Sequence, residues 1–239
     1  GGAVALTKAD LVPAELVELA AEEVRELLAG TPFAGVPVLP VSAHTGVGIA
    51  ELKRLLVEQG ARARPHLVAG RPFREPIDRV FSLTGAGTVV TGTSLSGALE
   101  VGSEVVVQPL GAPARVRRLH VHGAERRRVE AGERVAINLT GLARDALERG
   151  HQVLSPGPWQ PTLLVTVDLE LLASAPAALD EGDEVEVHAL AARVPARIER
   201  LARRPLEPGG RANGQLLLRE PLLLFPGDRM VLRRPAPVN

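Results

Sequence analysis

Apolar and polar positions in the first 62 residues follow two different periods in alternation. Residues 4–12 begin as a short apolar run that ends in polar residues, and residues 36–43 form a second apolar run. Between Pro13 and Gly30 the apolar positions recur at helical spacing: Leu16, Leu19, Val24, Leu27 and Leu28. A glycine turn is followed by a second helical face: Ile49, Leu52, Leu55 and Leu56. This order of strand, helix, strand and helix predicts part of a parallel α/β sheet.

Beyond a linker predicted at residues 63–72, the helical period disappears. The remaining sequence consists of Val- and Leu-rich runs separated by Gly, Pro and Asp. Ten such runs are predicted as strands: 77–83, 87–95, 104–109, 115–121, 133–139, 163–171, 184–190, 194–201, 212–219 and 228–233. Ten short strands favour two small antiparallel β-barrels. Three prolines within 154–161 mark the break, so we predict barrels at residues 73–157 and 158–239.

The stretch SLTGAGTVVTGT, residues 82–93, carries three glycines within eight residues. A phosphate-binding loop requires a helix directly after the glycines, because the helix N-terminus holds the anion. The residues that follow are rich in Val and Thr and show no helical period. We therefore predict strand, turn and strand, with Gly85, Ala86 and Gly87 in a hairpin turn.

Composition narrows the class of protein. No cysteine is present, which excludes disulfides and thiolate metal sites, and no apolar run reaches the roughly 18–20 residues that span a bilayer. We expect a cytoplasmic protein that makes no membrane contact. The net charge is zero, but residues 1–60 hold eight acidic and four basic residues, so an anionic partner is expected on the remainder. Because the single methionine is Met230, we also expect a piece of a longer protein.

Two short motifs stand at the ends of the predicted parallel strands. TKAD, residues 7–10, ends the first strand, where a carboxylate can accept both N–H donors on one edge of guanine. SAHTG, residues 42–46, ends the second, where backbone N–H groups can meet the guanine carbonyl oxygen. The residues of this candidate guanine site are Lys8, Asp10, Ser42 and Ala43. Lysine and aspartate at strand ends are also common surface residues, and the sequence contains no G-x-x-x-x-G-K-[ST] motif to cradle phosphates.

Longer stretches resemble the translational GTPases of the elongation factor Tu class: ALTKADLV, VSAHTGVGI, PIDRVFSLTGAGTVVTGTSLSGALEVGSEV and ERGHQVLS. Within this class the chain is more similar to one family, the selenocysteine-specific elongation factors. Three features favour that family: threonine at Thr7, PIDRVF at the start of the first barrel, and GDRMVLRRPAPVN at the end of the second. The resemblance covers essentially the whole chain, is strongest for residues 71–157 and is looser for residues 158–239.

The resemblance implies a four-part protein in which residues 1–62 are the C-terminal part of a P-loop GTPase domain. Such a factor binds GTP with Mg²⁺, carries selenocysteinyl-tRNA to the ribosome, and hydrolyses GTP on delivery at recoded UGA codons. Its C-terminal winged-helix part, which reads an mRNA hairpin, has no counterpart in this chain. The chain alone, which lacks the P-loop and switch regions, is expected to be a monomer without GTPase activity, and no catalytic residue is assigned to it.

The resemblance also implies a selenocysteine pocket in the first barrel. By motif, an acidic and a basic residue fall on Asp78 and Arg79 of IDR, and a further arginine falls on Arg134 of GER. A selenol ionises at much lower pH than a serine hydroxyl, so two arginines stabilise the anion and do little for serine. Without the family, the favoured interpretation is an ordinary ion pair of Asp78 and Arg79 at a strand end. Two departures are noted: GER replaces the common GDR, and Thr7 replaces an asparagine, so guanine binding relies more on Asp10.

Three further features allow more than one interpretation. The arginine-rich stretches 115–128 and 193–211 are either contacts for tRNA phosphates or solvated strand faces. His120 and His122 have the spacing of two metal ligands on one strand face, but no third ligand lies nearby in the sequence. Trp159, in the segment between the barrels, is expected to be a packing anchor.

Three other functions fit parts of the sequence pattern. Another Tu-like factor would bind seryl-tRNA as tightly as selenocysteinyl-tRNA. A non-catalytic pair of RNA-binding barrels would bind tRNA regardless of the nucleotide and the aminoacyl group. The nucleotide-binding subunit of a sulfate-activating enzyme shares the barrels, but the pairing of IDR with GER argues against it.

Overall fold

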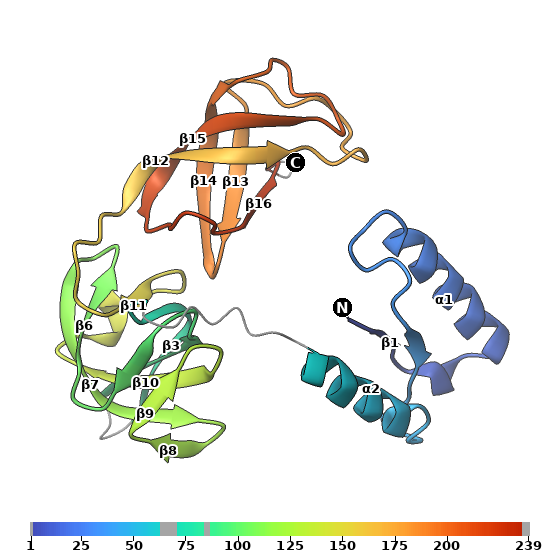
Figure 1. Cartoon of the computed structure of the whole chain (residues 1–239), viewed down its shortest axis with the longest axis horizontal. Coiled ribbons are helices and arrows are strands. Elements are labelled where there is room, and N and C mark those ends of the chain that lie inside the picture. The colour runs from blue at the N-terminus through green and yellow to red at the C-terminus, as the bar shows by residue number, and fades with distance from the viewer. Residues whose placement is uncertain (1, 63–70, 84–86, 236–239) are drawn as a thin grey trace. The chain divides into compact units, whose positions relative to one another are not determined.

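The structure is a computed structural model that describes residues 2–62, 71–83 and 87–235. The chain divides into two compact units, residues 1–66 and 67–239. The first unit contains both long helices and a small parallel sheet, and the second contains the remaining strands (Figure 1).

The first unit has the predicted order of strands and helices. Its elements are β1 (Val4–Leu6), the 3-10 helix η1 (Ala9–Leu11), α1 (Ala14–Leu28), β2 (Val38–Pro40) and α2 (Ile49–Arg62). β1 and β2 pair in parallel, as predicted. Pro13 precedes α1, where a missing N–H costs no hydrogen bond, and Glu15 stands near the positive end of the helix dipole. Among the described residues, no helix combines the length and apolar character that crossing a membrane requires.

The second unit begins with a closed barrel of six strands. They are β3 (Arg74–Leu83), β4 (Gly87–Thr93), β6 (Glu104–Gln108), β7 (Ala112–Val121), β10 (Arg134–Thr140) and β11 (Gln152–Leu154). The pairing order is β10, β4, β3, β11, β6, β7, and the pairing of β7 with β10 closes the ring. The shorter elements of this barrel are β5 (Ala98–Glu100), β8 (Ala124–Arg126), β9 (Arg128–Glu130) and the 3-10 helix η2 (Arg144–Ala146).

Alternate residues of the strands fill the first barrel. On β10, Val135, Ile137 and Leu139 are at most 2% exposed, whereas the side chains of Arg134 and Thr140 at its two ends are exposed. This is the period-two alternation of a strand with one buried face. Sixteen buried apolar residues form one contiguous core, so the barrel encloses a complete hydrophobic interior.

The glycine-rich stretch 82–93 belongs to two paired strands. β3 and β4 are antiparallel, with Leu83 opposite Gly87, and the element directly after the glycines is a strand. The phosphate-loop alternative is therefore excluded, because it needs a helix N-terminus at that point. Gly85 and Ala86 of the predicted turn lie outside the described residues, while Gly87 has a φ of +84°, which favours glycine.

The second predicted barrel is an open, curled sheet. Its strands are β12 (Thr162–Glu170), β13 (Glu184–Ala189), β14 (Ala192–Leu201), β15 (Arg211–Leu222) and β16 (Met230–Arg233). They pair in the order β12, β15, β14, β13, β16, and within the described residues the two outer strands do not pair with each other. The predicted fold class, an α/β part followed by two antiparallel β-barrels, is confirmed with this difference in closure.

All ten runs predicted as strands contain a strand, although the bounds differ by a few residues. The sequence pattern does not predict β5, β8, β9 and β11. Each of these has three residues, which is too short for an alternating pattern to stand out.

A buried arginine joins the two barrels. Arg74, the first residue of β3, donates two hydrogen bonds of 2.8 Å to the Asp228 carboxylate and one of 2.7 Å to Gln152 Oε1. Its guanidinium carbon lies 4.2 Å from the centroid of the Phe225 ring. Trp159 packs edge-on against the same ring with a centroid distance of 5.4 Å, so it is a packing anchor as predicted. The Arg74 and Asp228 side chains are only 8% and 14% exposed, so this contact fixes β3 to the second barrel.

Candidate functional site

Asp78 stands at a β-bulge in β3. The pairing of β3 with β4 shifts register between Ile77 and Arg79, so Asp78 is the extra residue. A bulge bends its strand and redirects the side chain of the extra residue. Ile77 is fully buried in the core and Arg79 is exposed, and Asp78 between them is partly buried. The bulge therefore places a carboxylate at the surface of the barrel with limited access to water.

Asp78 binds residues of two other strands. Arg134 of β10 donates to Asp78 Oδ2 at 2.6 Å and to Oδ1 at 3.2 Å, and the Thr91 hydroxyl of β4 donates to Oδ1 at 2.8 Å. Burial opposes the ionisation of Asp78, but the hydrogen bonds from Arg134 and Thr91 outweigh it, so the pKa of Asp78 lies below its usual range. Arg134 is thus oriented by a carboxylate while its side chain remains 50% exposed, which leaves it open to a ligand.

Arg79 is not the partner of Asp78. The ion pair that Asp78 forms is with Arg134, 56 residues away, and among the described residues Arg79 forms no ion pair. The alternative of an ordinary Asp78–Arg79 pair at a strand end is therefore wrong. Arg79 instead lines a groove of about 530 Å³ whose lining residues are Asp78, Arg79, Val80, Phe81, Arg144, Leu147, Glu148 and Arg149. Three arginines against two carboxylates give this groove an excess of positive charge.

The segment 144–149 forms the wall of the groove opposite β3. Contacts with the barrel core, with His151 and with Ala191 hold this segment in place. The Leu147 side chain is buried in the core of the barrel. The backbone N–H of Glu148 donates to Nδ1 of His151 at 3.3 Å, and burial lowers the pKa of His151, so the ring stays neutral and able to accept. Arg149 Nε donates to the Ala191 carbonyl at 3.2 Å. Sequence reasoning missed this segment because its arginines belong to no dense basic run.

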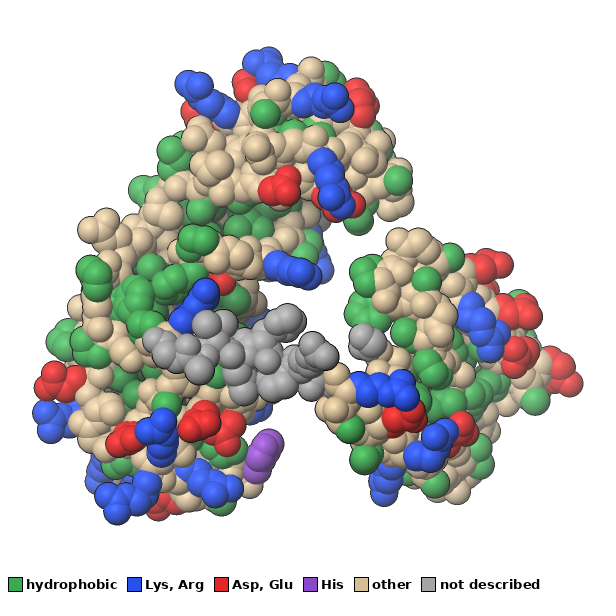
Figure 2. Space-filling view, viewed as in Figure 1, with side chains coloured by type: hydrophobic (Ala, Val, Ile, Leu, Met, Phe, Trp, Pro, Cys, Tyr) green, Lys and Arg blue, Asp and Glu red, His purple; other side chains and the backbone are tan. Residues whose placement is uncertain are grey.

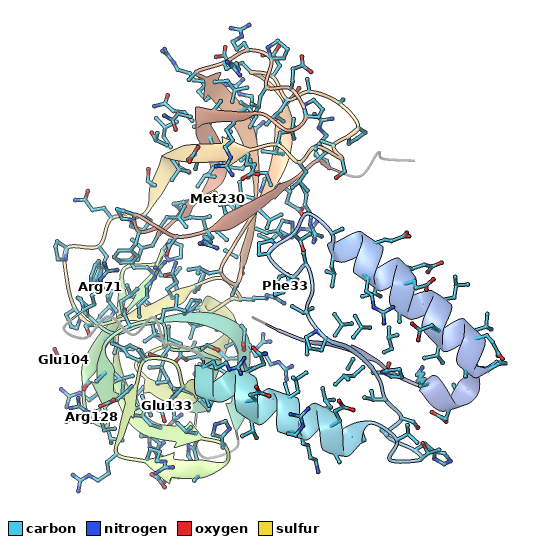
Figure 3. The ribbon with its side chains drawn as sticks, turned by 45° about the vertical axis from the view of Figure 1, so that its right-hand side comes forward. Phe33, Arg71, Glu104, Arg128, Glu133 and Met230 are labelled. Carbon is cyan, nitrogen blue, oxygen red and sulfur yellow. The ribbon has the colours of Figure 1, made fainter. Side chains whose placement is uncertain are left out.

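Glu133 occupies the central position of GER. Figure 3 labels this residue. Its carboxylate accepts a 2.8 Å hydrogen bond from the backbone N–H of Glu130, within the turn that leads into β10. The longer glutamate side chain therefore has a structural role in the turn, and Arg134 keeps its place as the first residue of β10.

A second buried carboxylate lies close to the Asp78–Arg134 pair. Glu75 of β3 has no exposed surface, and neither of its carboxylate oxygens has a hydrogen-bond partner. Sequence reasoning missed this residue. The available signal was its position midway between Phe73 and Ile77, because alternation along a strand sends all three side chains to the same face.

The four candidate guanine residues lie at one end of the parallel strands. The Ala9 N–H donates to the Val41 carbonyl at 3.2 Å, which joins TKAD to the start of SAHTG. Ser42 is buried and its hydroxyl accepts a 3.1 Å hydrogen bond from the Thr45 N–H, whereas Lys8, Asp10 and Ala43 are exposed. Gly48 ends this loop. The position requires glycine, because a Cβ there would stand 2.2 Å from a backbone oxygen.

The arginine-rich stretches are partly balanced by carboxylates. Six of their arginines form ion pairs with Asp or Glu: Arg115, Arg128, Arg193, Arg197, Arg204 and Arg211. Figure 2 accordingly shows basic and acidic side chains interspersed on the visible face of the first barrel. These pairs favour the interpretation of solvated strand faces for much of both stretches.

His120 and His122 do not share a strand face. His120 lies on β7, but β7 ends at Val121, and His122 has a φ of +51° in the turn that follows. The prediction of one shared face is wrong because the strand turns before its second histidine. Within residues 2–62, 71–83 and 87–235, no group of three or more His, Asp or Glu side chains is suited to hold a metal ion.

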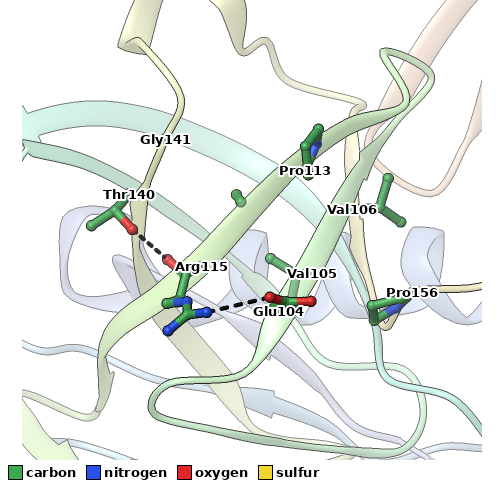
Figure 4. A pocket seen from close by; sticks show the side chains of 9 residues that line it. Glu104, Val105, Val106, Pro113, Arg115, Thr140, Gly141 and Pro156 are labelled. Atoms are coloured by element: carbon green, nitrogen blue, oxygen red, sulfur yellow. Dashed lines mark hydrogen bonds and ion pairs between the residues drawn. The ribbon is translucent and has the colours of Figure 1, made fainter.

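A second groove, of about 470 Å³, lies at the other end of β10 from Arg134 (Figure 4). Arg115 binds Glu104 at 3.3 Å, and the Thr140 hydroxyl donates to the Arg115 carbonyl at 3.3 Å. These polar groups are satisfied by one another, so nothing in this groove points to a ligand.

Two family models match the second unit. Residues 87–154 match the model described as elongation factor Tu domain 2. Residues 166–237 match the model of the β-barrel domain of selenocysteine-specific elongation factors. The two matches together cover most of both barrels, and the first includes Arg134.

Curated proteins with the same family name match nearly the whole chain. The selenocysteine-specific elongation factor of Desulfomicrobium baculatum is 42% identical over 238 residues, which are 100% of this chain and 37% of that protein. The factor of the same name from Haemophilus influenzae is 33% identical over 231 residues, 96% of this chain and 36% of that protein. The chain therefore spans little more than a third of the length of these relatives.

A solved structure is similar to the chain in fold. Translation elongation factor SelB from Methanococcus maripaludis, in complex with the GTP analogue GPPNHP, is similar with a TM-score of 0.81 and 26% identity. The match covers 97% of this chain and 54% of that one.

Proposed function

Because the chain belongs to the family of selenocysteine-specific elongation factors, we propose that it binds selenocysteinyl-tRNA and GTP within a translation factor that delivers this tRNA to the ribosome. The observation that carries the proposal is the Asp78–Arg134 pair beside a groove lined by three arginines. GTP hydrolysis is proposed for the complete factor only. Stoichiometric GTP turnover by these 239 residues alone would contradict this assignment.

The selenocysteine site consists of Asp78, Arg79 and Arg134. The selenol is an anion at neutral pH, so a guanidinium can bind it by a charge-assisted hydrogen bond, which is stronger than a bond between neutral groups. Asp78 holds Arg134 at 2.6 Å and so fixes the direction of its remaining N–H donors. Arg79, exposed and without an ion-pair partner among the described residues, supplies the second positive charge. A neutral serine side chain gains little from either arginine.

The groove next to this site suits the end of a tRNA. Arg144 and Arg149 line the groove with Arg79, and Phe81 on the same wall is 37% exposed. Guanidinium groups bind phosphates, and an exposed aromatic ring can stack on a base. Arg144 and Arg149 are therefore the arginines that we assign to the tRNA, in preference to the ion-paired arginines of 115–128 and 193–211.

The guanine base of GTP is assigned to Lys8, Asp10, Ser42 and Ala43. The fit rests on two features: an exposed carboxylate at Asp10, and the Ala9–Val41 hydrogen bond, which joins η1 to the segment that follows β2. The base would be read by the carboxylate and by backbone N–H groups of the loop, with the Lys8 stem covering the ring. The chemistry of the nucleotide resides in its phosphates, for which this chain offers no P-loop.

Competition between selenocysteinyl-tRNA and seryl-tRNA on the same tRNA body tests the proposal. The chain is used alone and also preceded by the upstream part of a G domain with GTP bound. We expect a preference for selenocysteine of at least about tenfold, which corresponds to one charge-assisted contact. Arg134→Ala should remove most of this preference.

Arg128→Ala is the matched control. Arg128 is in the same barrel, is 55% exposed and pairs with Glu100 at 2.8 Å, but it lies outside the groove. Its removal should leave the preference unchanged. Equal binding of both tRNAs, unaffected by Arg134→Ala, would instead identify a general Tu-like carrier. Binding that ignores both the nucleotide and the aminoacyl group would identify a non-catalytic RNA-binding pair of barrels.

A further inference from the structure

Glu75 is a fully buried acid on the strand that carries the proposed selenocysteine site. It has no exposed surface, and both carboxylate oxygens lack a hydrogen-bond partner. Its side chain passes over Gly92 of β4, where an added Cβ would come within 2.7 Å of Glu75 Cγ. An unpaired carboxylate in such a place is very costly, whereas a neutral acid costs much less. The geometry alone therefore favours the protonated form.

The electrostatics of the site point the same way. Burial raises the pKa of Glu75 well above its usual range, the Asp78 carboxylate raises it further, and Arg134 opposes the rise. The influence is mutual, because Glu75 also acts on the Arg134 guanidinium. Glu75 is thus coupled to both members of the pair that we assign to selenocysteine.

Few groups face Glu75 from the neighbouring strands. Gly92 of β4 is uncharged, and Val153 of β11, its partner in register, is apolar. The charged groups that act on it are Asp78 of β3 and Arg134 of β10. The adjacent Arg74 is bound to Asp228 and Gln152. No described cation is therefore dedicated to Glu75.

We propose that Glu75 is a positioning residue of the selenocysteine site, a neutral acid behind the Asp78–Arg134 pair that keeps a net positive charge available to an anionic aminoacyl side chain. The inference rests on the proposed function. With Glu75 neutral, Arg79 and Arg134 face the single carboxylate of Asp78. With Glu75 ionised, two carboxylates balance these two guanidinium groups, and the attraction for a selenolate is weaker.

The first experiment measures the protonation of Glu75 in the 239-residue chain. The side-chain carboxyl carbons of glutamate and aspartate are labelled with ¹³C and followed by NMR from pH 4 to pH 9, and Glu75→Gln and Asp78→Asn assign the two signals. We expect one glutamate to titrate well above the usual value of about 4.3. The Asp78 carboxyl signal should move at the same pH in the wild type and not in Glu75→Gln. Titration of Glu75 near 4.3 would overturn the inference.

The second experiment measures the affinity for selenocysteinyl-tRNA over the same pH range. As Glu75 ionises, the affinity of the wild type for selenocysteinyl-tRNA should fall about tenfold, because the new negative charge weakens the attraction for the selenolate. Glu75→Gln should bind as tightly as the wild type at low pH and should not show this loss. The control Glu104→Gln changes an exposed carboxylate at the opposite end of the barrel and should keep the wild-type profile.

The outcomes separate this inference from the proposed function. Identical pH profiles for the wild type and Glu75→Gln would overturn the inference while the preference for selenocysteine stands. If Glu75 titrates well above its usual value but no variant prefers selenocysteine, both the proposed function and the role assigned to Glu75 in it are overturned. If Glu75→Gln does not fold, Glu75→Leu fills the same buried space without a polar group and gives the same two readouts.

Discussion

The first 62 residues and the first barrel differ in how completely they bury their apolar side chains. In the barrel, sixteen apolar residues form one closed core, and Ile77 and Ile137 have no exposed surface. In residues 2–62, the only buried apolar side chains are Ala21, Val41 and Leu55. The two parts have equally clear hydrophobic patterns, yet only one of them encloses a core.

The exposed side chains of the first unit explain the difference. Several apolar residues on its helices are more than half exposed: Leu16, Leu19, Leu27, Leu56 and Val57. They belong to helices beside a sheet of only two strands, β1 and β2. A local pattern specifies whether a segment becomes a helix or a strand, but most of the stability of these elements comes from neighbours that cover their apolar faces. The barrel can therefore hold its site by itself, whereas the candidate guanine site depends on a less enclosed scaffold.

Hydrogen exchange should show the largest contrast between the two parts. Amides of β10 should exchange at the rate of global unfolding, because both their strand neighbours and the core must open. Amides of β1 and β2 should exchange at least about a thousandfold faster than those of β10, which corresponds to a free energy of opening about 4 kcal/mol lower. Exchange followed by mass spectrometry on peptides from 36–43 and 134–140 measures this ratio. Equal protection would show that the first unit is as stable as the barrel.

Truncation of one buried and one exposed apolar residue tests the same difference in burial. Ile137→Ala should lower the free energy of unfolding of the barrel by about 3–4 kcal/mol, because it leaves a cavity in a closed core. Val57→Ala, at a side chain 74% exposed in α2, should change the free energy of unfolding of the first unit by less than about 0.5 kcal/mol. Urea unfolding followed by circular dichroism compares the two variants. Similar losses would mean that Val57 is covered in solution.

The contact of Arg74 with Asp228 tests whether the two barrels unfold together. Arg74→Ala leaves the Asp228 carboxylate, 14% exposed, without its two hydrogen bonds from a cation, so we expect a loss of about 2–3 kcal/mol. Calorimetry should then resolve two transitions in place of one. The double variant with Asp228→Ala should lose less than the sum of the single variants. Full additivity would show that the two side chains do not interact.

Asp78→Asn should lower stability less than Arg74→Ala does. The pKa of Asp78 is lowered in the folded chain, so its contribution is present above the unfolded value of about 3.9 and is lost as the pH falls through the folded value. Because the pair is partly exposed, we expect less than about 1 kcal/mol at pH 7. Thermal unfolding at pH 7 and at pH 3 should show the two proteins converging at the lower pH. A constant difference would contradict the assigned ionisation.

The sequence predicted the elements of the fold better than the partners of its side chains. The ten long strand runs and both helices follow from periodicity, because each is long enough to show its period. The partner of Asp78 did not follow, because the bulge at Asp78 and the pairing of β4 with β10 bring Arg134 to it from 56 residues away. His122 was misplaced for a related reason, since a turn with positive φ interrupts the strand.

Buried polar residues were the least predictable part of the site. In FREPIDRVF, the glutamate at Glu75 reads as one more charged residue among several. Its burial depends on Gly92, which lies on another strand and leaves room for its side chain. The Arg74–Asp228 contact likewise joins residues 154 positions apart. Such contacts depend on strand register, which a single sequence does not give.

The affinity ratio of selenocysteinyl-tRNA to cysteinyl-tRNA, on one tRNA body, tests whether the site recognises the side chain by its charge. The two side chains have similar shapes, but at pH 7 the selenol is ionised and the thiol, with a pKa of about 8.5, is mostly neutral. We expect a preference for selenocysteine of at least about tenfold at pH 7, which narrows above pH 8.5 as the thiol ionises. Equal affinities at pH 7, or a ratio that does not change with pH, would contradict recognition of the side chain by its charge.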